Sequence, residues 1–176
     1  MAAIDKKKER TELVYCSSCD NSKPLKATPV TRKYDEGGLD NVTLKGVQEF
    51  RCPKCGEVYY NYGNIEQLHQ LIAYHLVRKK ALLNGKEIRF LRKHMGYSST
   101  VLAKLVGQEL ETISRIENDK AKVVPLFDHY IRALVIQKGH DRNYDLHDHI
   151  LNETGEEFSR LEASFKKNGW DVRSIA

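Results

Sequence analysis

Residues 97–120 read YSSTVLAKLVGQELETISRIENDK, and this stretch determines how the middle of the chain folds. Large aliphatic side chains recur in it at helical spacing over two successive segments: Leu102, Leu105, Val106, Ile113 and Ile116. Ala103 is small where two helices must cross closely, and Gly107 stands where a turn between helices needs a positive φ angle. The stretch predicts two short helices, Ser99–Val106 with Ser98 as N-cap and Leu110–Asn118.

Further helices are expected on both sides of this pair. Glu87–His94 precedes it, and another helix begins at Pro125, a favourable first helical position, and ends before Gly139. Upstream, residues 64–84 show an apolar face, with Asn64 as cap and Gln67 completing a capping box. Asn84-Gly85 is expected to end this helix. We therefore predict a linker helix within 63–85 and an all-α domain over 86–139.

The all-α stretch resembles the Cro-like (XRE-type) helix-turn-helix family of DNA-binding domains. The family pattern appears as Leu102-Ala103-Lys-Leu-Val-Gly107 and as Ile113-Ser114-Arg115-Ile116-Glu117-Asn118-Asp119. The resemblance implies that the third helix of the domain lies in the major groove, with Leu110, Glu111 and Arg115 facing bases. It also implies that Arg92 pairs with Glu117 inside the domain. The full set of residues implied to contact DNA is Ser98, Ser99, Leu110, Glu111, Thr112, Arg115, Asn118 and Lys120.

All four cysteines of the chain lie in two CxxC pairs, Cys16–Cys19 and Cys52–Cys55. This spacing matches the bite of one tetrahedral metal ion, and we expect a single structural Zn²⁺ with Cys16, Cys19, Cys52 and Cys55 as ligands. Gly56 suits the turn after the second pair because the chain there often needs positive φ. Iron would use the same ligands, and two disulfides, buried reduced thiols or a redox-active CxxC are the alternatives.

The cysteines bracket a short β-rich region. Strands are predicted at Ala27–Tyr34, Val42–Phe50 and Val58–Tyr60, with a turn at Asp35–Gly38. About fifty residues bury little core, so the metal must supply much of the stability. We predict a zinc-binding β domain over 13–62, preceded by a disordered, charged tail over 1–12.

Residues 140–176 are expected to form an acidic helical C-terminal extension. Thr154–Glu157 has the pattern of a capping box, and Phe158, Leu161 and Phe165 fall on one helical face before Gly169. The predicted fold class is accordingly α+β: a small N-terminal zinc-stapled β unit, then an all-α helix-turn-helix domain, then this helical extension.

Taken together, the two halves resemble the MqsA/YgiT antitoxin family. The second cysteine pair lies in Gly46-Val47-Gln-Glu-Phe50-Arg-Cys52-Pro-Lys-Cys55-Gly56-Glu57, and a linker helix and helix-turn-helix follow. The resemblance implies that the zinc domain binds a toxin of the mRNA-cleaving ribonuclease class. It also implies a homodimer that binds a palindromic operator and represses its own operon. The alternative is a stand-alone XRE-family transcription regulator whose zinc domain binds another protein.

The composition favours a polyanion as partner and argues against an enzyme or a membrane-spanning protein. Residues 61–140 carry 13 basic and 7 acidic side chains, a net charge of +6, whereas residues 141–176 carry 5 and 8. We expect no catalytic residues and no cofactor besides zinc, because four thiolates close the metal shell and no phosphate-binding glycine loop is present. No apolar run is long enough for a membrane span, and free thiols without a signal peptide favour the cytoplasm.

Overall fold

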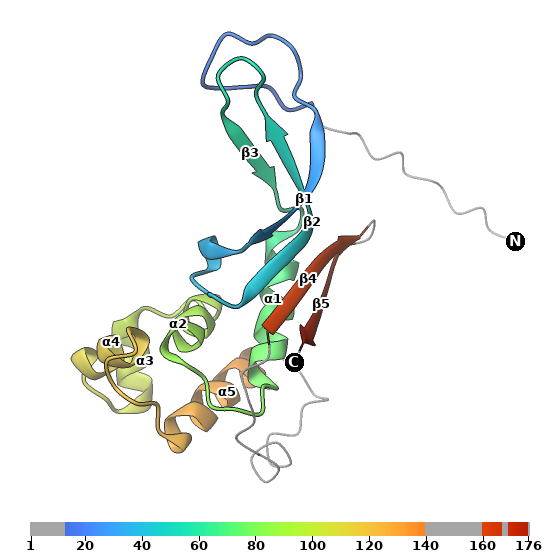
Figure 1. Cartoon of the computed structure of the whole chain (residues 1–176). Helices are drawn as coiled ribbons and strands as arrows, with labels where there is room; N and C mark the ends of the chain where they lie inside the picture. Colours follow the sequence, from blue (N-terminus) through green and yellow to red (C-terminus); the bar gives the residue numbers. More distant parts are fainter. Residues whose placement is uncertain (1–12, 140–159, 167–168, 176) are drawn as a thin grey trace, which may run out of the picture. The chain divides into compact units, whose positions relative to one another are not determined.

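The computed structural model describes residues 13–139, 160–166 and 169–175 (Figure 1). Three strands come first: β1 (Ala27–Lys33), β2 (Val42–Arg51) and β3 (Val58–Asn61), with a short 3-10 turn η1 (Asp35–Gly37) after β1. Five helices follow: α1 (Ile65–Val77), α2 (Gly85–His94), α3 (Ser99–Val106), α4 (Leu110–Glu117) and α5 (Pro125–Gly139). Two strands, β4 (Arg160–Lys166) and β5 (Gly169–Ile175), are the last elements that the structure describes.

The described residues divide into two compact units that share β2. The first unit holds the residues up to Val30 together with Val47–Tyr62. In it the second half of β2 pairs antiparallel with β3, from Gln48↔Asn61 to Arg51↔Val58. Its small core is formed by Cys16, Leu25, Phe50 and Cys52.

The second unit holds Thr31–Gly46 and the described residues from Gly63 onward. Here the first half of β2 pairs parallel with β4, from Val42↔Leu161 to Lys45↔Ser164. Strand β4 pairs antiparallel with β5, and α1 packs against both strands of this hairpin (Figure 1). Helices α2 and α5 pack against α1 and against each other, and α4 packs against α2 and α3.

The predicted fold class is wrong, because the part that follows the cysteine unit is not all-α. All five strands belong to one sheet in the order β1-β2-β4-β5, with β3 also paired to β2. The residues expected to form a C-terminal helix form β4, in which buried Leu161 and Ala163 alternate with less buried Glu162 and Ser164. This is the two-residue period of a strand that buries one face. The capping-box residues 154–157 and Phe158 lie outside the described residues.

The predicted helices on either side of Gly107 are confirmed, whereas the predicted end of the linker helix is wrong. Asn64 caps α1 as expected, since its side chain accepts a hydrogen bond from the Gln67 amide. The helix stops at Val77, however, and Asn84 instead caps α2 in a capping box with Glu87. The side chain of Gln67 accepts a hydrogen bond from the Trp170 amide, at 3.2 Å, and thereby ties α1 to β5.

The hairpin should be an integral part of the second unit. Trp170 is 5% exposed and lies beside Phe165, so Trp170→Ala should lower the free energy of unfolding by about 3–5 kcal/mol. The measurement is chemical denaturation followed by circular dichroism at 222 nm, which reports on the helices. Ile175→Ala, at a residue that is 41% exposed, is the matched control and should change stability little. Equal denaturation midpoints for Trp170→Ala and wild type would contradict the packing of the hairpin on α1.

Candidate functional site

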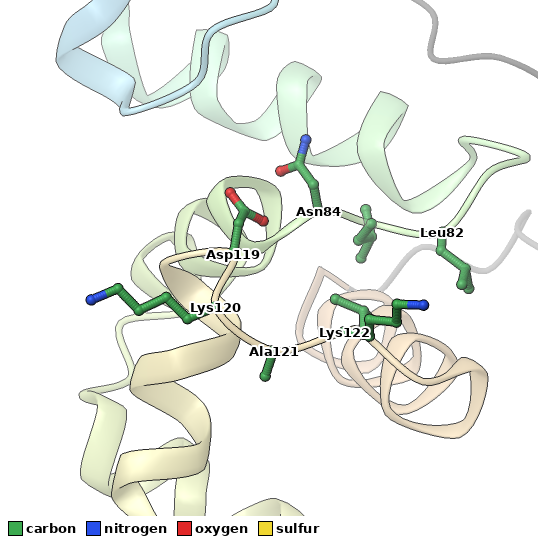
Figure 2. Close-up of a pocket in the computed structure, with 8 residues that line it drawn as sticks. Leu82, Asn84, Asp119, Lys120, Ala121 and Lys122 are labelled. Atoms are coloured by element: carbon green, nitrogen blue, oxygen red, sulfur yellow. The ribbon is translucent and has the colours of Figure 1, made fainter.

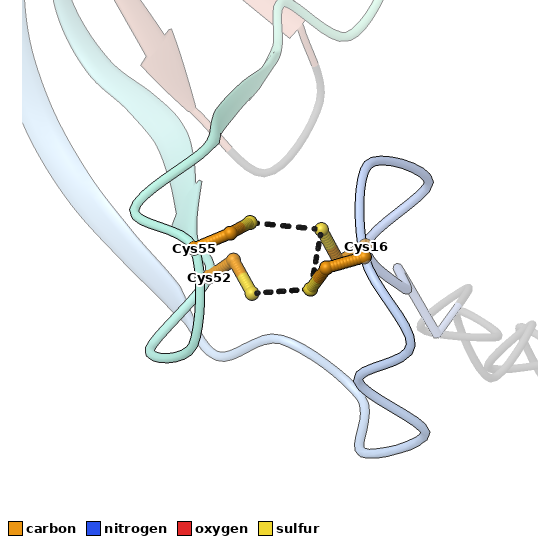
Figure 3. Close-up of side chains that lie close together, drawn as sticks. Cys16, Cys52 and Cys55 are labelled. Carbon is orange, nitrogen blue, oxygen red and sulfur yellow. Dashed lines mark hydrogen bonds between the residues drawn. The ribbon is translucent and has the colours of Figure 1, made fainter.

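The four cysteines lie together in the first unit, as the two CxxC pairs predicted. The Sγ atoms of Cys16 and Cys55 are 3.5 Å apart, and Cys19 Sγ lies 3.6 Å from both Cys16 Sγ and Cys52 Sγ. Figure 3 shows the sulfurs of Cys16, Cys52 and Cys55 pointing toward one another. All four sulfurs lie within 4.8 Å of one another and none forms a disulfide.

This geometry fits one tetrahedral metal ion. Metal–sulfur bonds of about 2.3 Å require sulfur–sulfur distances of about 3.8 Å, close to those observed. Each CxxC pair turns tightly enough to aim both sulfurs inward, and Gly56 closes the second turn at φ 79°, as predicted. Cys16 and Cys52 are buried whereas Cys55 is exposed, so one side of the cluster faces solvent. The cluster could therefore hold a metal ion.

Side chains outside the cluster hold its sulfurs in place. The hydroxyl of Tyr59, on β3, lies 3.5 Å from Cys16 Sγ and accepts a hydrogen bond of 2.9 Å from the Ser17 amide. The hydrogen bond with Tyr59 is the largest of several, with those from the Ser18 backbone, Cys55 and Cys19, that lower the pKa of Cys16 to about 6. Asn21 Nδ2 approaches Cys52 Sγ at 3.7 Å. The backbone amide of Cys55 lowers the pKa of Cys52.

A second group of predicted site residues lies on α3 and α4. Leu102, Ala103, Ile113 and Ile116 are buried where the two helices pack together. Ser98 caps α3 by accepting a hydrogen bond of 3.1 Å from the Val101 amide. Gly107 ends α3 at φ 64°, in the left-handed region that the sequence predicted. Because Ile113 and Ile116 point inward, Glu111, Ser114 and Arg115 are left exposed on the outer face of α4.

The predicted pair of Arg92 and Glu117 is confirmed. Arg92 Nε and Nη2 donate to the two carboxylate oxygens of Glu117, at 2.5 and 2.9 Å, and both side chains are buried. Arg92 Nη1 also donates to the carbonyl of Tyr97, just before α3. The pair therefore joins α2, the start of α3 and the end of α4, and fixes the orientation of the outer face of α4.

The structure brings most of the predicted DNA-contacting residues to the surface. Leu110 is 48% exposed, Ser99 and Thr112 are half-buried, and five more are exposed: Ser98, Glu111, Arg115, Asn118 and Lys120. Arg115 makes no ion pair or side-chain hydrogen bond with the residues that the structure describes. Asn118 is already engaged, since it accepts from Arg89 Nη2 at 2.8 Å and donates to the Ser114 carbonyl at 2.7 Å.

The loop between α4 and α5 adds basic side chains next to α4. Lys120 and Lys122 point to opposite sides of this loop in Figure 2, around a shallow groove of about 450 Å³. The loop is anchored to the start of α2, because Asp119 Oδ1 accepts a hydrogen bond of 2.8 Å from the Gly85 amide. Lys120 is thus held close to the end of α4, where its own amide donates to the Arg115 carbonyl.

Sequence reasoning missed three residues that support these sites. Tyr59 and Asn21 approach the sulfurs from segments with no ligand motif, although the tyrosines Tyr59, Tyr60 and Tyr62 stand out in the sequence. Arg89 supports Asn118 and also contacts Glu117 at 3.4 Å. Its position three residues before Arg92 places both arginines on one face of α2, which is the signal that could have identified it.

Comparisons of the chain with protein-family models, with curated proteins and with solved structures find no match. Within the described residues, none of the helices combines the length and the apolar character needed to cross a membrane.

The hydroxyl of Tyr59 should strengthen metal binding by the cysteines. Tyr59→Phe removes the hydrogen bond to Cys16 and should weaken affinity for Zn²⁺ by about tenfold or more, the usual effect of losing an outer-sphere partner. Affinity is measured by competition with a chromophoric chelator. Tyr60→Phe, which alters the next residue of β3 on the opposite face, is the control and should leave affinity unchanged. Equal affinities for Tyr59→Phe and wild type would show that the hydroxyl does not act on the metal site.

Proposed function

We propose that this protein is a DNA-binding antitoxin and repressor of its own operon. In this proposal α3 and α4 form a helix-turn-helix, the four cysteines hold one structural zinc ion, and the zinc-bearing unit binds the toxin. The observation that carries the proposal is the outer face of α4. It presents Glu111, Ser114 and Arg115 to solvent on a helix that the buried Arg92–Glu117 pair holds rigidly.

The residues around α4 have the chemistry that duplex DNA requires. A guanidinium such as that of Arg115 can donate two hydrogen bonds to guanine O6 and N7 in the major groove. Lys120, Lys122 and the N-terminus of α3 supply positive charge for phosphates on either side. Glu111 can accept a hydrogen bond from cytosine N4, so the acidic residue adds selectivity for sequence.

An apolar surface beside α3 supports a homodimer on a palindromic operator. Val101 and Leu105 on α3 are each 42% exposed, and Leu126 and Tyr130 on α5 are 80% and 42% exposed. The Tyr130 hydroxyl donates to the Leu105 carbonyl at 3.3 Å, which joins the two helices at this surface. A single helix reads too few base pairs for specificity in a genome, and a second copy on this surface would supply the other half-site.

The small core and the surface tyrosines of the cysteine unit support the proposal that this unit binds the toxin. Its core of four buried residues is too small to make a stable β unit alone, so zinc would hold it in a fixed shape. The rings of exposed Tyr60 and half-buried Tyr62 stack with their centroids 6.2 Å apart, and aromatic side chains are common anchors in protein interfaces. We assign the toxin class, an mRNA-cleaving ribonuclease, from the family resemblance of the sequence.

Two substitutions should separate base reading from phosphate binding. Arg115→Ala should weaken binding to the DNA upstream of the gene by about 1–3 kcal/mol and random duplexes by less, because it removes a base contact. Lys120→Ala should weaken both about equally and lower the salt dependence by about one unit. The measurement is a fluorescence anisotropy titration at two salt concentrations, with Arg173→Ala as an exposed control outside α3 and α4. Wild-type affinity in Arg115→Ala would show that α4 does not read the bases.

Binding of the toxin should require an intact cysteine unit and should not require Arg115. When the tagged chain is produced with its neighbouring genes, wild type and Arg115→Ala should co-purify with one small protein, and Cys52→Ser should not. The captured protein should arrest growth when produced alone and should cleave mRNA. Retained DNA binding by Cys52→Ser would show that the helical part still folds. Absence of any such growth-arresting protein would instead favour a stand-alone regulator.

A further inference from the structure

A cleft of about 510 Å³ lies in the second unit, and its lining includes no residue of α4. It is formed where the end of β1, the start of β2, the start of β4 and the first turn of α2 meet. Its polar lining consists of Lys33, Asp40, Asn41, Thr43, Asn84, Lys86 and Arg160. A cavity of this volume is in the range of small-molecule sites.

The cleft is positively charged. Lys33, Lys86 and Arg160 bring three cationic groups to it, and Asp40 is the one acidic residue of its lining, so the net charge is +2. Asp40 forms an ion pair with Lys86, and this leaves Lys33 and Arg160 without an acidic partner among the described residues.

One side chain of this cleft lacks the partner that its burial requires. Asn41 Nδ2 is buried and has no hydrogen-bond partner among the residues that the structure describes. The backbone carbonyl of Asn41 accepts from the Leu161 amide at 3.0 Å, so the residue is held in place beside Arg160. An amide donor without an acceptor carries an energetic cost, which an acceptor that reached Nδ2 would remove.

We propose that this cleft binds a small phosphate monoester. A phosphate group offers the oxygen acceptors that Asn41 Nδ2, Lys33 and Arg160 lack, and its charge of about −2 above its second pKa matches the net charge of the cleft. The two lysines and the arginine then surround the phosphate from three elements, and the remaining volume takes the organic part of the ligand. The lining of this site shares no residue with the outer face of α4 or with the cysteine cluster.

Isothermal titration of the full chain in chloride buffer tests the assignment. The probes are inorganic phosphate and adenosine 5′-monophosphate, with adenosine as the ligand that lacks the phosphate. Phosphate and the monophosphate should bind saturably and adenosine should not. Lys33→Gln and Arg160→Gln should each weaken binding at least tenfold. Arg173→Gln removes a charge from the same hairpin outside the cleft and should bind like wild type.

Asn41→Leu provides a readout that does not depend on charge. It removes the unpartnered donor while keeping a similar volume, so the free protein should melt no lower than wild type, whereas phosphate binding should weaken. Circular dichroism checks that every variant is folded.

Three results would overturn the proposal. Absence of saturable phosphate binding, or equal binding by wild type, Lys33→Gln and Arg160→Gln, would show that the cleft is not a phosphate site. Weaker binding of duplex DNA by these two variants, with phosphate binding unchanged, would assign the cleft to the DNA-binding surface instead.

Discussion

The helical unit depends on the hydrogen bonds that the buried guanidinium of Arg132 donates. Arg132, on α5, is fully buried and donates to the carbonyls of Val77, Lys79 and Ala81, at 2.9, 2.7 and 2.8 Å. Its Nε also donates to Asp128, at 2.6 Å, and Asp128 in turn accepts from the Leu83 amide at 2.8 Å. Burying two charges is costly unless each is fully hydrogen-bonded. The Arg132–Asp128 pair meets this condition because it also hydrogen-bonds the backbone carbonyls and the amide of the segment at and after the end of α1. The end of α1, the segment after it and α5 are thereby held as one piece.

Two further buried ion pairs extend this arrangement toward α4. Lys79, whose carbonyl Arg132 holds, donates to the carboxylate of Glu87, which is also fully buried in the first turn of α2. Burial raises the pKa of Glu87, and the nearby Lys79 opposes the rise, so the carboxylate depends on this lysine for its charge. At the other end of α2, Arg92 holds Glu117 of α4. The position of the outer face of α4 is thus set by charged contacts as well as by aliphatic packing.

The sequence predicts local features of this fold well and long-range features poorly. A helix cap such as Asn64 or Ser98 bonds to an amide three residues further on, and a CxxC pair spans four residues. Both patterns can therefore be recognised directly in the sequence. The role of Arg132 could not, because its carbonyl partners are 51 to 56 residues away. The sequence predicts a helix where β4 and β5 form a hairpin because Leu161 and Phe165 also fit helical spacing. Two signals favour strands: the apolar residues Leu161 and Ala163 alternate with the polar residues Glu162 and Ser164, and the dipeptide Asn168-Gly169 is typical of a hairpin turn.

The two units are stabilised by different interactions, and β2 is the strand that belongs to both units. The first unit has a core of four buried residues, two of them cysteines, so its order depends on what the sulfurs bind. The second unit combines a continuous aliphatic core with three buried ion pairs and contains no cysteine. Strand β2 belongs to both, since its residues from Val42 to Lys45 pair with β4 and those from Gln48 to Arg51 pair with β3. Disorder in the cysteine unit would therefore leave the first half of β2 held by β4. The hairpin that the sequence did not predict thus holds the first half of β2 in the second unit independently of the cysteines.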